Sequence, residues 1–276
     1  DCTDRLETGY RSFNDAFIPE FLDRNPGKSR IAAGLAGGQL WTVCDGMAVG
    51  DVLISPDGKG AYSIGHVVGS YRYSPGDELP HQRPVEWLQR GVPASSLSDN
   101  IRRSMGYAGT ICELADHGRE LDDLIEGQNP SIIKAASHDD VEDPVAFVME
   151  SHLEEFLVEN WQRTEFGCTY DLYAENGELA GKQYQTDTGP LDLLAISKDQ
   201  KRLLIIELKR GRASDAVVGQ ILRYMGYVKE VLAEPGQTVE GAIVALDDDL
   251  RIRRALTMTD GIKFYRYRID FRLEEA

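Results

Sequence analysis

Two apolar segments joined by a short polar stretch constrain the fold of this chain more than any other feature. Leu191–Ile196 and Leu203–Lys209 have the length and the branched side chains of buried strands, and Ser197–Arg202 between them is typical of a turn. Because side chains alternate along a strand, Glu207 and Lys209 are predicted to lie on one face and their apolar neighbours on the other. The sequence therefore predicts two adjacent buried strands, one of which ends in two charged side chains.

The position of Glu207 in an apolar strand points to metal-assisted chemistry. A carboxylate there is costly to remove from water without a partner, and Asp192 on the preceding strand is expected to lie beside it. Two close carboxylates repel each other, and Mg²⁺, which takes one or two carboxylates together with substrate phosphate, relieves that repulsion. Mn²⁺ is expected to substitute for it. Lys209 would orient a water or balance developing charge, as hydrolysis of a phosphodiester requires. The alternative is that Asp192 caps a turn and that Glu207 and Lys209 form a surface pair.

The surrounding segments predict a mixed α/β sheet. Apolar residues at helical spacing indicate helices over Pro144–Trp161 and Ala213–Ala233. The latter is expected to bury Val217, Ile221 and Met225 and to carry Gln220, Tyr224 and Tyr227 on the opposite stripe. Further strands are predicted at Tyr170–Ala174, Lys182–Gln185, Gly241–Leu246 and Ile262–Ile269.

These residues resemble the PD-(D/E)XK nuclease superfamily, and its NucS-type and Mrr-like members in particular. Asp192 matches the first acid and Glu207-Leu208-Lys209 the (D/E)XK element, while Glu154 matches the acidic helix and Gln220 opens a Q-x-x-R-Y element. The first motif departs from the family pattern, because Gly-Pro-Leu-Asp stands where Pro-Asp is usual. The resemblance implies a restriction-endonuclease-like mixed sheet flanked by helices and a Mg²⁺-dependent endodeoxyribonuclease. It implies catalytic roles for Asp192, Glu207, Lys209, Glu154 and Gln220, with Asp192 and Glu207 as metal ligands.

The charge distribution is uneven. The chain has 30 basic and 46 acidic residues, a net charge of −16, which argues against general electrostatic coating of nucleic acid. Residues 201–230, however, are basic on balance. Contacts to the DNA backbone are expected from Arg210, Arg212, Arg223 and Tyr224, and the alternative is that the arginines only solvate this face.

The first half of the chain is predicted to consist mostly of β-strands. A hairpin is predicted over Gly50–Val68 and a short helix over Ala94–Met105. The short strands predict a small, partly closed β-barrel, which resembles PUA/EVE-type modules. That resemblance implies a pocket for an everted base, lined by Trp41, Tyr71, Tyr73, Arg83 and Trp87. The alternative is that these aromatic residues belong to the core of the barrel.

Three parts are expected: a DNA-reading domain over residues 1–112, an acidic linker over 113–143 and the nuclease domain over 144–276. The linker prediction rests on residues 111–143, which include ten acidic and two basic residues. A short acidic helix is expected within this segment, around Glu120–Glu126. No apolar run is long enough to cross a bilayer, and four widely spaced cysteines without a secretory leader favour a cytoplasmic protein with reduced thiols.

The combined prediction is a metal-dependent endonuclease acting on double-stranded DNA, with or without modified bases, in a modification-dependent restriction system. The first alternative is a NucS-like repair nuclease for mismatched or branched DNA. The second is a non-catalytic nucleic-acid- or ligand-binding protein on a nuclease fold. A homodimer is plausible for the enzyme, because a single site of this kind cuts one strand.

Overall fold

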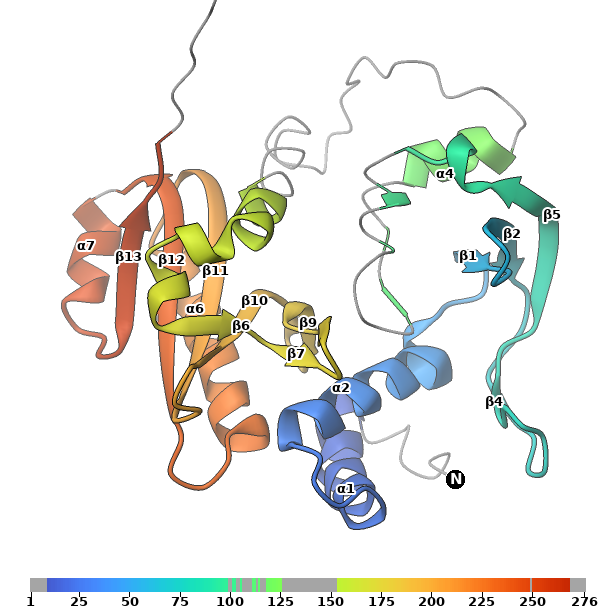
Figure 1. Cartoon of the computed structure of the whole chain (residues 1–276), viewed down its shortest axis with the longest axis horizontal. Helices are drawn as coiled ribbons and strands as arrows, with labels where there is room; N and C mark the ends of the chain where they lie inside the picture. The colour runs from blue at the N-terminus through green and yellow to red at the C-terminus, as the bar shows by residue number, and fades with distance from the viewer. Residues whose placement is uncertain are drawn as a thin grey trace, which may run out of the picture. The chain divides into compact units, whose positions relative to one another are not determined.

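The chain divides into two compact units, Asp1–Lys134 and Ala135–Ala276. The computed structural model describes residues 9–98, 101–102, 105, 111–112, 114, 118–125, 153–248 and 250–268 (Figure 1). Most of the expected acidic linker, including residues 126–143, lies outside the described residues. Each unit is therefore considered by itself.

The N-terminal unit combines helices with short antiparallel strands. Two sheets are described: a three-stranded sheet in the order β1-β2-β5 and a two-stranded ribbon of β3 and β4. The predicted hairpin is confirmed, since β1 and β2 pair antiparallel with Val52 opposite His66. The elements are α1 (Gly9–Arg24), α2 (Arg30–Trp41), a π-helical turn (Thr42–Gly46), β1 (Val52–Pro56), β2 (Ala61–Val67), β3 (Arg72–Tyr73), β4 (His81–Gln82), β5 (Val85–Pro93), a 3₁₀ turn (Ala94–Ser96) and α4 (Gly118–Ile125).

This unit differs from the predicted one in its helices and in its sheet. The first described residues form α1 and α2, where no helix is predicted, and α2 begins at the N-cap Ser29, whose side chain accepts a hydrogen bond from the Ala32 N–H. The described strands form an open sheet and a ribbon, and barrel closure is not shown. Of the helix expected over Ala94–Met105, the structure describes a 3₁₀ turn and helical residues at 101–102 and 105, and the residues between them lie outside the described part.

The acidic helix α4 belongs to the N-terminal core. Leu121 and Leu124 are buried in a cluster with Ile64 and Val92 of the sheet, and Gln89 of β5 donates hydrogen bonds to the carbonyls at the end of the helix. A helix is confirmed in this segment, but assigning it to a solvated linker was wrong. The reason is that Leu121 and Leu124 are at helical spacing and pack on the sheet, whereas the composition of the segment reflects only its many acidic residues.

The C-terminal unit contains a six-stranded mixed sheet, and its α/β class agrees with the prediction. The strand order is β13-β12-β11-β10-β6, with β9 also pairing with β10. β10 runs antiparallel to β11, whereas β11, β12 and β13 are parallel (Figure 1). The elements are a helix over residues 153–159, two 3₁₀ turns (Trp161–Arg163 and Phe166–Cys168), β6 (Tyr170–Leu172), β7 (Ala174–Glu175), β8 (Glu178–Leu179), β9 (Lys182–Thr186), β10 (Gly189–Ser197), β11 (Arg202–Arg212), α6 (Ala216–Tyr227), a π-helical turn (Val228–Leu232), β12 (Thr238–Asp247), α7 (Leu250–Leu256) and β13 (Ile262–Arg266).

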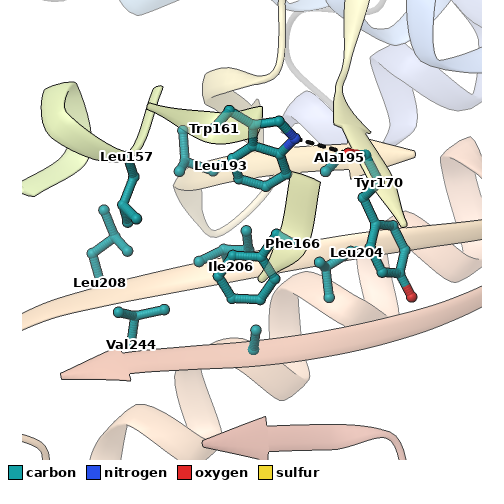
Figure 2. Close-up of a cluster of buried hydrophobic side chains, with 11 residues drawn as sticks. Leu157, Trp161, Phe166, Tyr170, Leu193, Ala195, Leu204, Ile206, Leu208 and Val244 are labelled. Carbon is teal, nitrogen blue, oxygen red and sulfur yellow. Dashed lines mark hydrogen bonds between the residues drawn. The ribbon is translucent and has the colours of Figure 1, made fainter. Parts of the chain in front are cut away.

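One face of this sheet packs on the segment that precedes β6. Figure 2 shows Trp161 and Phe166 lying over the side chains of β10 and β11, and the indole N–H of Trp161 donates a 2.8 Å hydrogen bond to the Tyr170 carbonyl. The strand residues on this face include Leu193, Ile206 and others that alternate with the charged positions. Burial of these apolar side chains fixes which face the intervening residues must occupy.

The other face of the sheet is covered by α6. A side chain at Gly241 of β12 would come within 2.9 Å of Ile221 and 2.8 Å of Met225. Only glycine allows this close approach of helix and strand. Glu207 lies on the same face as Ile205 and Leu203, both fully buried. The fold therefore turns Glu207 toward the helix α6 side of the sheet.

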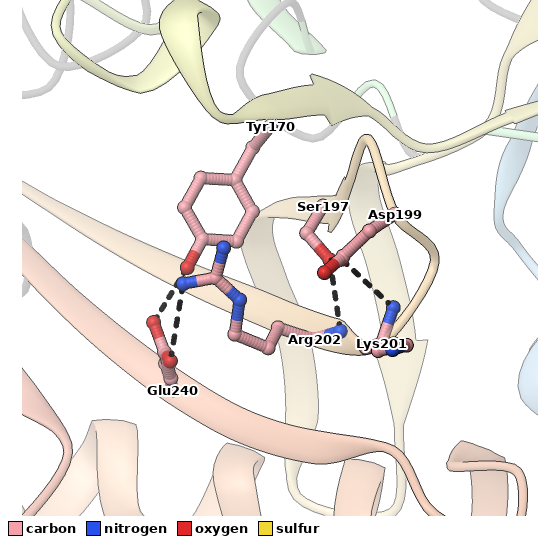
Figure 3. A network of polar contacts seen from close by, with 6 residues as sticks. All are labelled: Tyr170, Ser197, Asp199, Lys201, Arg202 and Glu240. Carbon is pink, nitrogen blue, oxygen red and sulfur yellow. Dashed lines mark hydrogen bonds and ion pairs between the residues drawn. The ribbon is translucent and has the colours of Figure 1, made fainter.

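A polar network ties the far ends of these strands together (Figure 3). The hydroxyl of Tyr170 donates a 2.5 Å hydrogen bond to Glu240, and Arg202 lies 3.8 Å from the same carboxylate and over the Tyr170 ring. Burial and the Glu240 carboxylate raise the pKa of Tyr170 to about 12, so the hydroxyl keeps its proton. In the predicted turn, Ser197 accepts a hydrogen bond from the Arg202 N–H. These contacts fix the register that positions the opposite ends of β10 and β11.

Candidate active site

Asp192 and Glu207 lie side by side on neighbouring strands, as the sequence predicts. The register pairs Leu193 with Ile206, and one further step along the same register places Asp192 opposite Glu207. One oxygen of Asp192, Oδ2, accepts a 2.7 Å hydrogen bond from the Leu208 N–H. Glu207 is 1% exposed, so the alternative of a surface pair at a strand end does not describe it.

The two carboxylates and Lys209 form one electrostatic cluster. Lys209 Nζ lies 2.8 Å from Glu207 Oε1, and the lysine side chain retains an exposed fraction of 32%. Burial raises the pKa of Asp192 well above its usual value, and the negative charge of Glu207 raises it further, while the hydrogen bond from Leu208 opposes both. The raised pKa shows that the ionised form of Asp192 is disfavoured beside Glu207, and a bound cation would stabilise the form in which both carboxylates are ionised.

The donor set of the cluster suits a hard divalent cation. Mg²⁺ is commonly held by one or two carboxylates, with water and substrate oxygens completing its shell, and Asp192 and Glu207 supply two carboxylates at adjacent positions. Within the part of the chain that the structure describes, no group of three or more His, Cys, Asp or Glu side chains is placed to hold a metal ion by itself. A cation at this position would therefore depend on water or substrate for much of its coordination.

Glu154 is held beside this cluster by two consecutive residues of β9. Lys182 Nζ lies 2.8 Å from Glu154 Oε1, and both side chains are almost completely buried. The amide of Gln183 donates hydrogen bonds to Glu154 Oε2 and, at 3.5 Å, to Asp192 Oδ1. Sequence reasoning missed Lys182 and Gln183, because a strand segment with two consecutive polar residues shows no pattern that distinguishes it from a solvated edge.

Helix α6 brings Gln220 and Tyr224 to the same face. The Gln220 amide lies 3.4 Å from the Tyr224 hydroxyl. Burial raises the pKa of Tyr224, the hydrogen bond from Gln220 opposes this, and the negative charges of Glu207 and Asp192 raise the pKa further. Val217 and Ile221 are buried as predicted, but Tyr224 and Tyr227 are buried too, at 4% and 3% exposed. The idea that these tyrosines lie on a stripe opposite the apolar face was wrong, because the sheet, together with the segments around it, covers more of the helix than the apolar stripe alone.

Of the arginines predicted to contact the DNA backbone, the structure describes the side chains of Arg212 and Arg223. Arg212 at the end of β11 lies 3.3 Å from Asp247, and Arg223 is exposed on α6. Arg210 belongs to β11, but its side chain lies outside the described residues. Contacts of these arginines with phosphate stay a prediction.

In the N-terminal unit, the aromatic residues predicted to read a base have partners within the unit. Trp41 ends α2, and its ring lies 5.6 Å from that of Tyr10 and 5.3 Å from that of Phe13. Tyr71 contacts His81 through a 2.8 Å hydrogen bond, and Tyr73 packs against the same imidazole. Burial lowers the pKa of His81, which favours the neutral ring. The contacts of Trp41 fit the alternative of a core residue, and base reading stays a prediction.

The remaining two residues of that set also make contacts inside the unit. Arg83 donates hydrogen bonds to the carbonyls of Val43 and Cys44, at 2.7 and 2.9 Å. Trp87 lies under the guanidinium of Arg90, 5.7 Å from the ring centroid. Arg83 thus caps the π-helical turn after α2, a structural role that its sequence position did not reveal.

Replacing Trp41 by alanine is expected to lower the free energy of unfolding by about 2–4 kcal/mol, because the ring packs on two aromatic side chains of α1. Urea denaturation of the full chain measures this. A variant of unchanged stability that had lost binding to DNA would contradict the packing role and favour base reading.

Comparison with known proteins finds a similarity that is confined to the C-terminal unit. Residues 149–269 match the Endonuclease NucS C-terminal domain. A curated Endonuclease NucS from Methanocaldococcus jannaschii is 31% identical over 93 residues, which cover 30% of this chain and 35% of that protein. The aligned segment is thus about a third of the relative's length. The NucS-like region contains the whole Asp192, Glu207 and Lys209 cluster.

The solved structures that resemble the chain have a lower sequence identity to it than the curated relative has. A repair endonuclease from Pyrococcus abyssi is 17% identical, with a TM-score of 0.35 over 78% of this chain and 65% of that one. An EndoMS-dsDNA2 complex is 16% identical, with a TM-score of 0.37 over 80% of this chain and 66% of that one. At these TM-scores the similarities do not bear on the function of this chain.

The N-terminal unit matches a different model. Residues 24–115 match a domain of unknown function, DUF8426. This match does not test the resemblance to PUA/EVE-type modules, which stays a prediction. Within the described residues, the structure contains no helix with the length and apolar character needed to span a membrane.

Proposed function

We propose that this chain is a metal-dependent DNA endonuclease of the NucS kind. The observation that carries the proposal is the buried Glu207 beside Asp192, with Lys209 in contact, in a region that matches the NucS C-terminal domain. A buried carboxylate pair is costly to maintain without a cation. Its presence on the face toward α6 is accounted for by metal binding and catalysis.

In the proposed mechanism, Asp192 and Glu207 bind the cation through their carboxylate oxygens. The cation would polarise the phosphodiester and lower the pKa of a bound water. Lys209 reaches solvent from its ion pair with Glu207, so its ammonium can orient a water or stabilise charge on the phosphate. The Tyr224 hydroxyl keeps its proton because its pKa is raised, and it can donate a hydrogen bond to a phosphate oxygen. Gln220 holds that hydroxyl.

The proposed role is repair of mismatched or branched duplex DNA rather than modification-dependent restriction. The family match supports the first, because the matched domain is that of Endonuclease NucS. Modification-dependent restriction depends on an aromatic cage that holds the modified base. Trp41, one of the residues expected to form that cage, packs instead against Tyr10 and Phe13. Modified-base reading and a homodimer stay predictions.

Cleavage of matched sets of duplexes tests the proposal. The purified full chain is incubated with Mg²⁺ or Mn²⁺ and with plain, mismatched, branched or base-modified duplexes of one sequence. We expect cleavage of the mismatched or branched duplex that stops on chelation of the metal. Cleavage confined to the modified duplex would overturn the repair role. If no duplex is cleaved, the proposal that the chain is an endonuclease is overturned.

A further inference from the structure

Gln183 occupies a special place in the sheet, directly across from Asp192. β9 pairs with β10 so that Tyr184 faces Leu191 and Lys182 faces Leu193. Gln183 is therefore opposite Asp192 on one side, as Glu207 is on the other. The three side chains form a row across three neighbouring strands, with Asp192 in the middle.

The backbone at Gln183 departs from regular strand geometry. Its φ is +48°, in the left-handed region that residues other than glycine rarely adopt. In a regular strand, consecutive side chains point to opposite faces, yet Lys182 and Gln183 both contact Glu154. The local distortion turns two neighbouring side chains toward one carboxylate. Such strained positions concentrate at functional sites.

The amide of Gln183 links the two carboxylates. Its Nε2 carries two hydrogens, and it donates to Glu154 Oε2 and to Asp192 Oδ1. The other oxygen of Asp192 accepts from the Leu208 N–H. Both oxygens of Asp192 therefore have a fixed donor, and the orientation of the carboxylate is defined from two sides.

Glu154, at the other end of this series of contacts, is held by an ion pair. Lys182 pairs with Glu154 at 2.8 Å in a buried position, so the negative charge of Glu154 is balanced before a cation binds. A neutral donor at position 183 can join Glu154 and Asp192 without adding charge, whereas a glutamate there would add a third negative group. The two carboxylate oxygens of Glu154 are thus engaged by Lys182 and Gln183.

We propose that Gln183 is a positioning residue that orients Asp192 for the cation, and that Glu154 acts through Gln183 and not as a metal ligand. This inference rests on the proposed function, because it takes Asp192 as a ligand. Residues that hold a metal ligand in place typically change metal affinity 10–100-fold when replaced. The role proposed for Glu154 differs from the catalytic role that the family resemblance implies.

Metal binding by the full chain without DNA tests the inference. Titration calorimetry with Mn²⁺ should show affinity about 10-fold or more weaker in Gln183→Leu, with the melting temperature in metal-free buffer little changed because Gln183 is exposed. Gln185→Leu is the matched control, since Gln185 is an exposed glutamine of the same strand that donates to the neighbouring Thr186 carbonyl. It should bind Mn²⁺ as the wild type does. Gln183→Asn, which suits a left-handed backbone but is too short to reach both carboxylates, gives the same readout if the leucine variant fails to fold.

Two further variants separate this inference from the proposed function. Asp192→Asn should abolish Mn²⁺ binding, and intact binding in that variant would overturn the metal site itself. If Asp192→Asn loses Mn²⁺ but Gln183→Leu binds it as tightly as Gln185→Leu does, the positioning role alone is overturned. Glu154→Gln should weaken binding to the extent that Gln183→Leu does. A complete loss equal to that of Asp192→Asn would overturn the indirect role of Glu154.

Discussion

Replacing Glu207 by glutamine is expected to reduce metal-dependent cleavage of DNA by about 100-fold or more, which corresponds to roughly 3 kcal/mol in the activation free energy. Glutamine keeps the shape of the buried side chain, so the fold should persist, but it removes the charge that holds a cation next to Asp192. Single-turnover cleavage with Mg²⁺ measures the change in rate.

The same variant has a second, independent consequence. The negative charge of Glu207 is one of the causes that raise the pKa of Asp192, so the pKa should fall toward its usual value in Glu207→Gln, although burial still keeps it raised. NMR titration of the metal-free protein can follow this carboxyl group.

Glu178→Gln is the matched control for both measurements, because it removes one exposed carboxylate of the same unit. Undiminished cleavage by Glu207→Gln would contradict its assignment as a ligand, and Lys209→Ala should lose rate while it still binds metal.

Replacing Lys182 by methionine is expected to lower the free energy of unfolding by about 3–5 kcal/mol. The reason is that the change leaves the carboxylate of Glu154 buried without its ion-pair partner; the exposed fractions of the two side chains are 10% and 7%. Urea denaturation in metal-free buffer measures the loss.

Two controls isolate the contribution of the buried charge. Arg212→Met removes a cation from an exposed pair with Asp247, where both side chains are about half exposed or more, and should cost under about 1 kcal/mol. The double variant Lys182→Met/Glu154→Gln should recover much of the loss, because no buried charge then lacks a partner. A single Lys182→Met variant as stable as Arg212→Met would show that the pair is not buried in solution.

Local patterns were sufficient to predict the strands that carry the acidic pair of the C-terminal unit. The apolar residues of β10 and β11 and the polar turn between them predict a hairpin, and strict alternation places Glu207 on the face away from Ile206. Neighbouring strands then bring Asp192 beside Glu207. This prediction required nothing beyond the period of a strand and the cost of burying a carboxylate.

Local patterns were insufficient for the N-terminal helices. α2 contains Gly34, Gly37 and Gly38, which lower helix propensity. In the structure these glycines are buried, and a Cβ at Gly37 would come within 2.3 Å of Asn14 on α1. Close packing of α1 on α2 stabilises a helix that its own sequence does not favour. In the same way, whether strands close into a barrel depends on pairing between distant segments.

The sequence by itself determined the acidic pair Asp192 and Glu207, the neighbouring Lys209 and the strands that carry them, because strand alternation and apolar burial are local in origin. Only the tertiary structure decided that Tyr224 is buried against the site and that Gln183 contacts Asp192. The first depends on how the sheet and the helix pack, and the second on a left-handed residue in β9 that redirects two neighbouring side chains. Both are contacts between different elements, and the period of one element carries no information about the side chains of its neighbour.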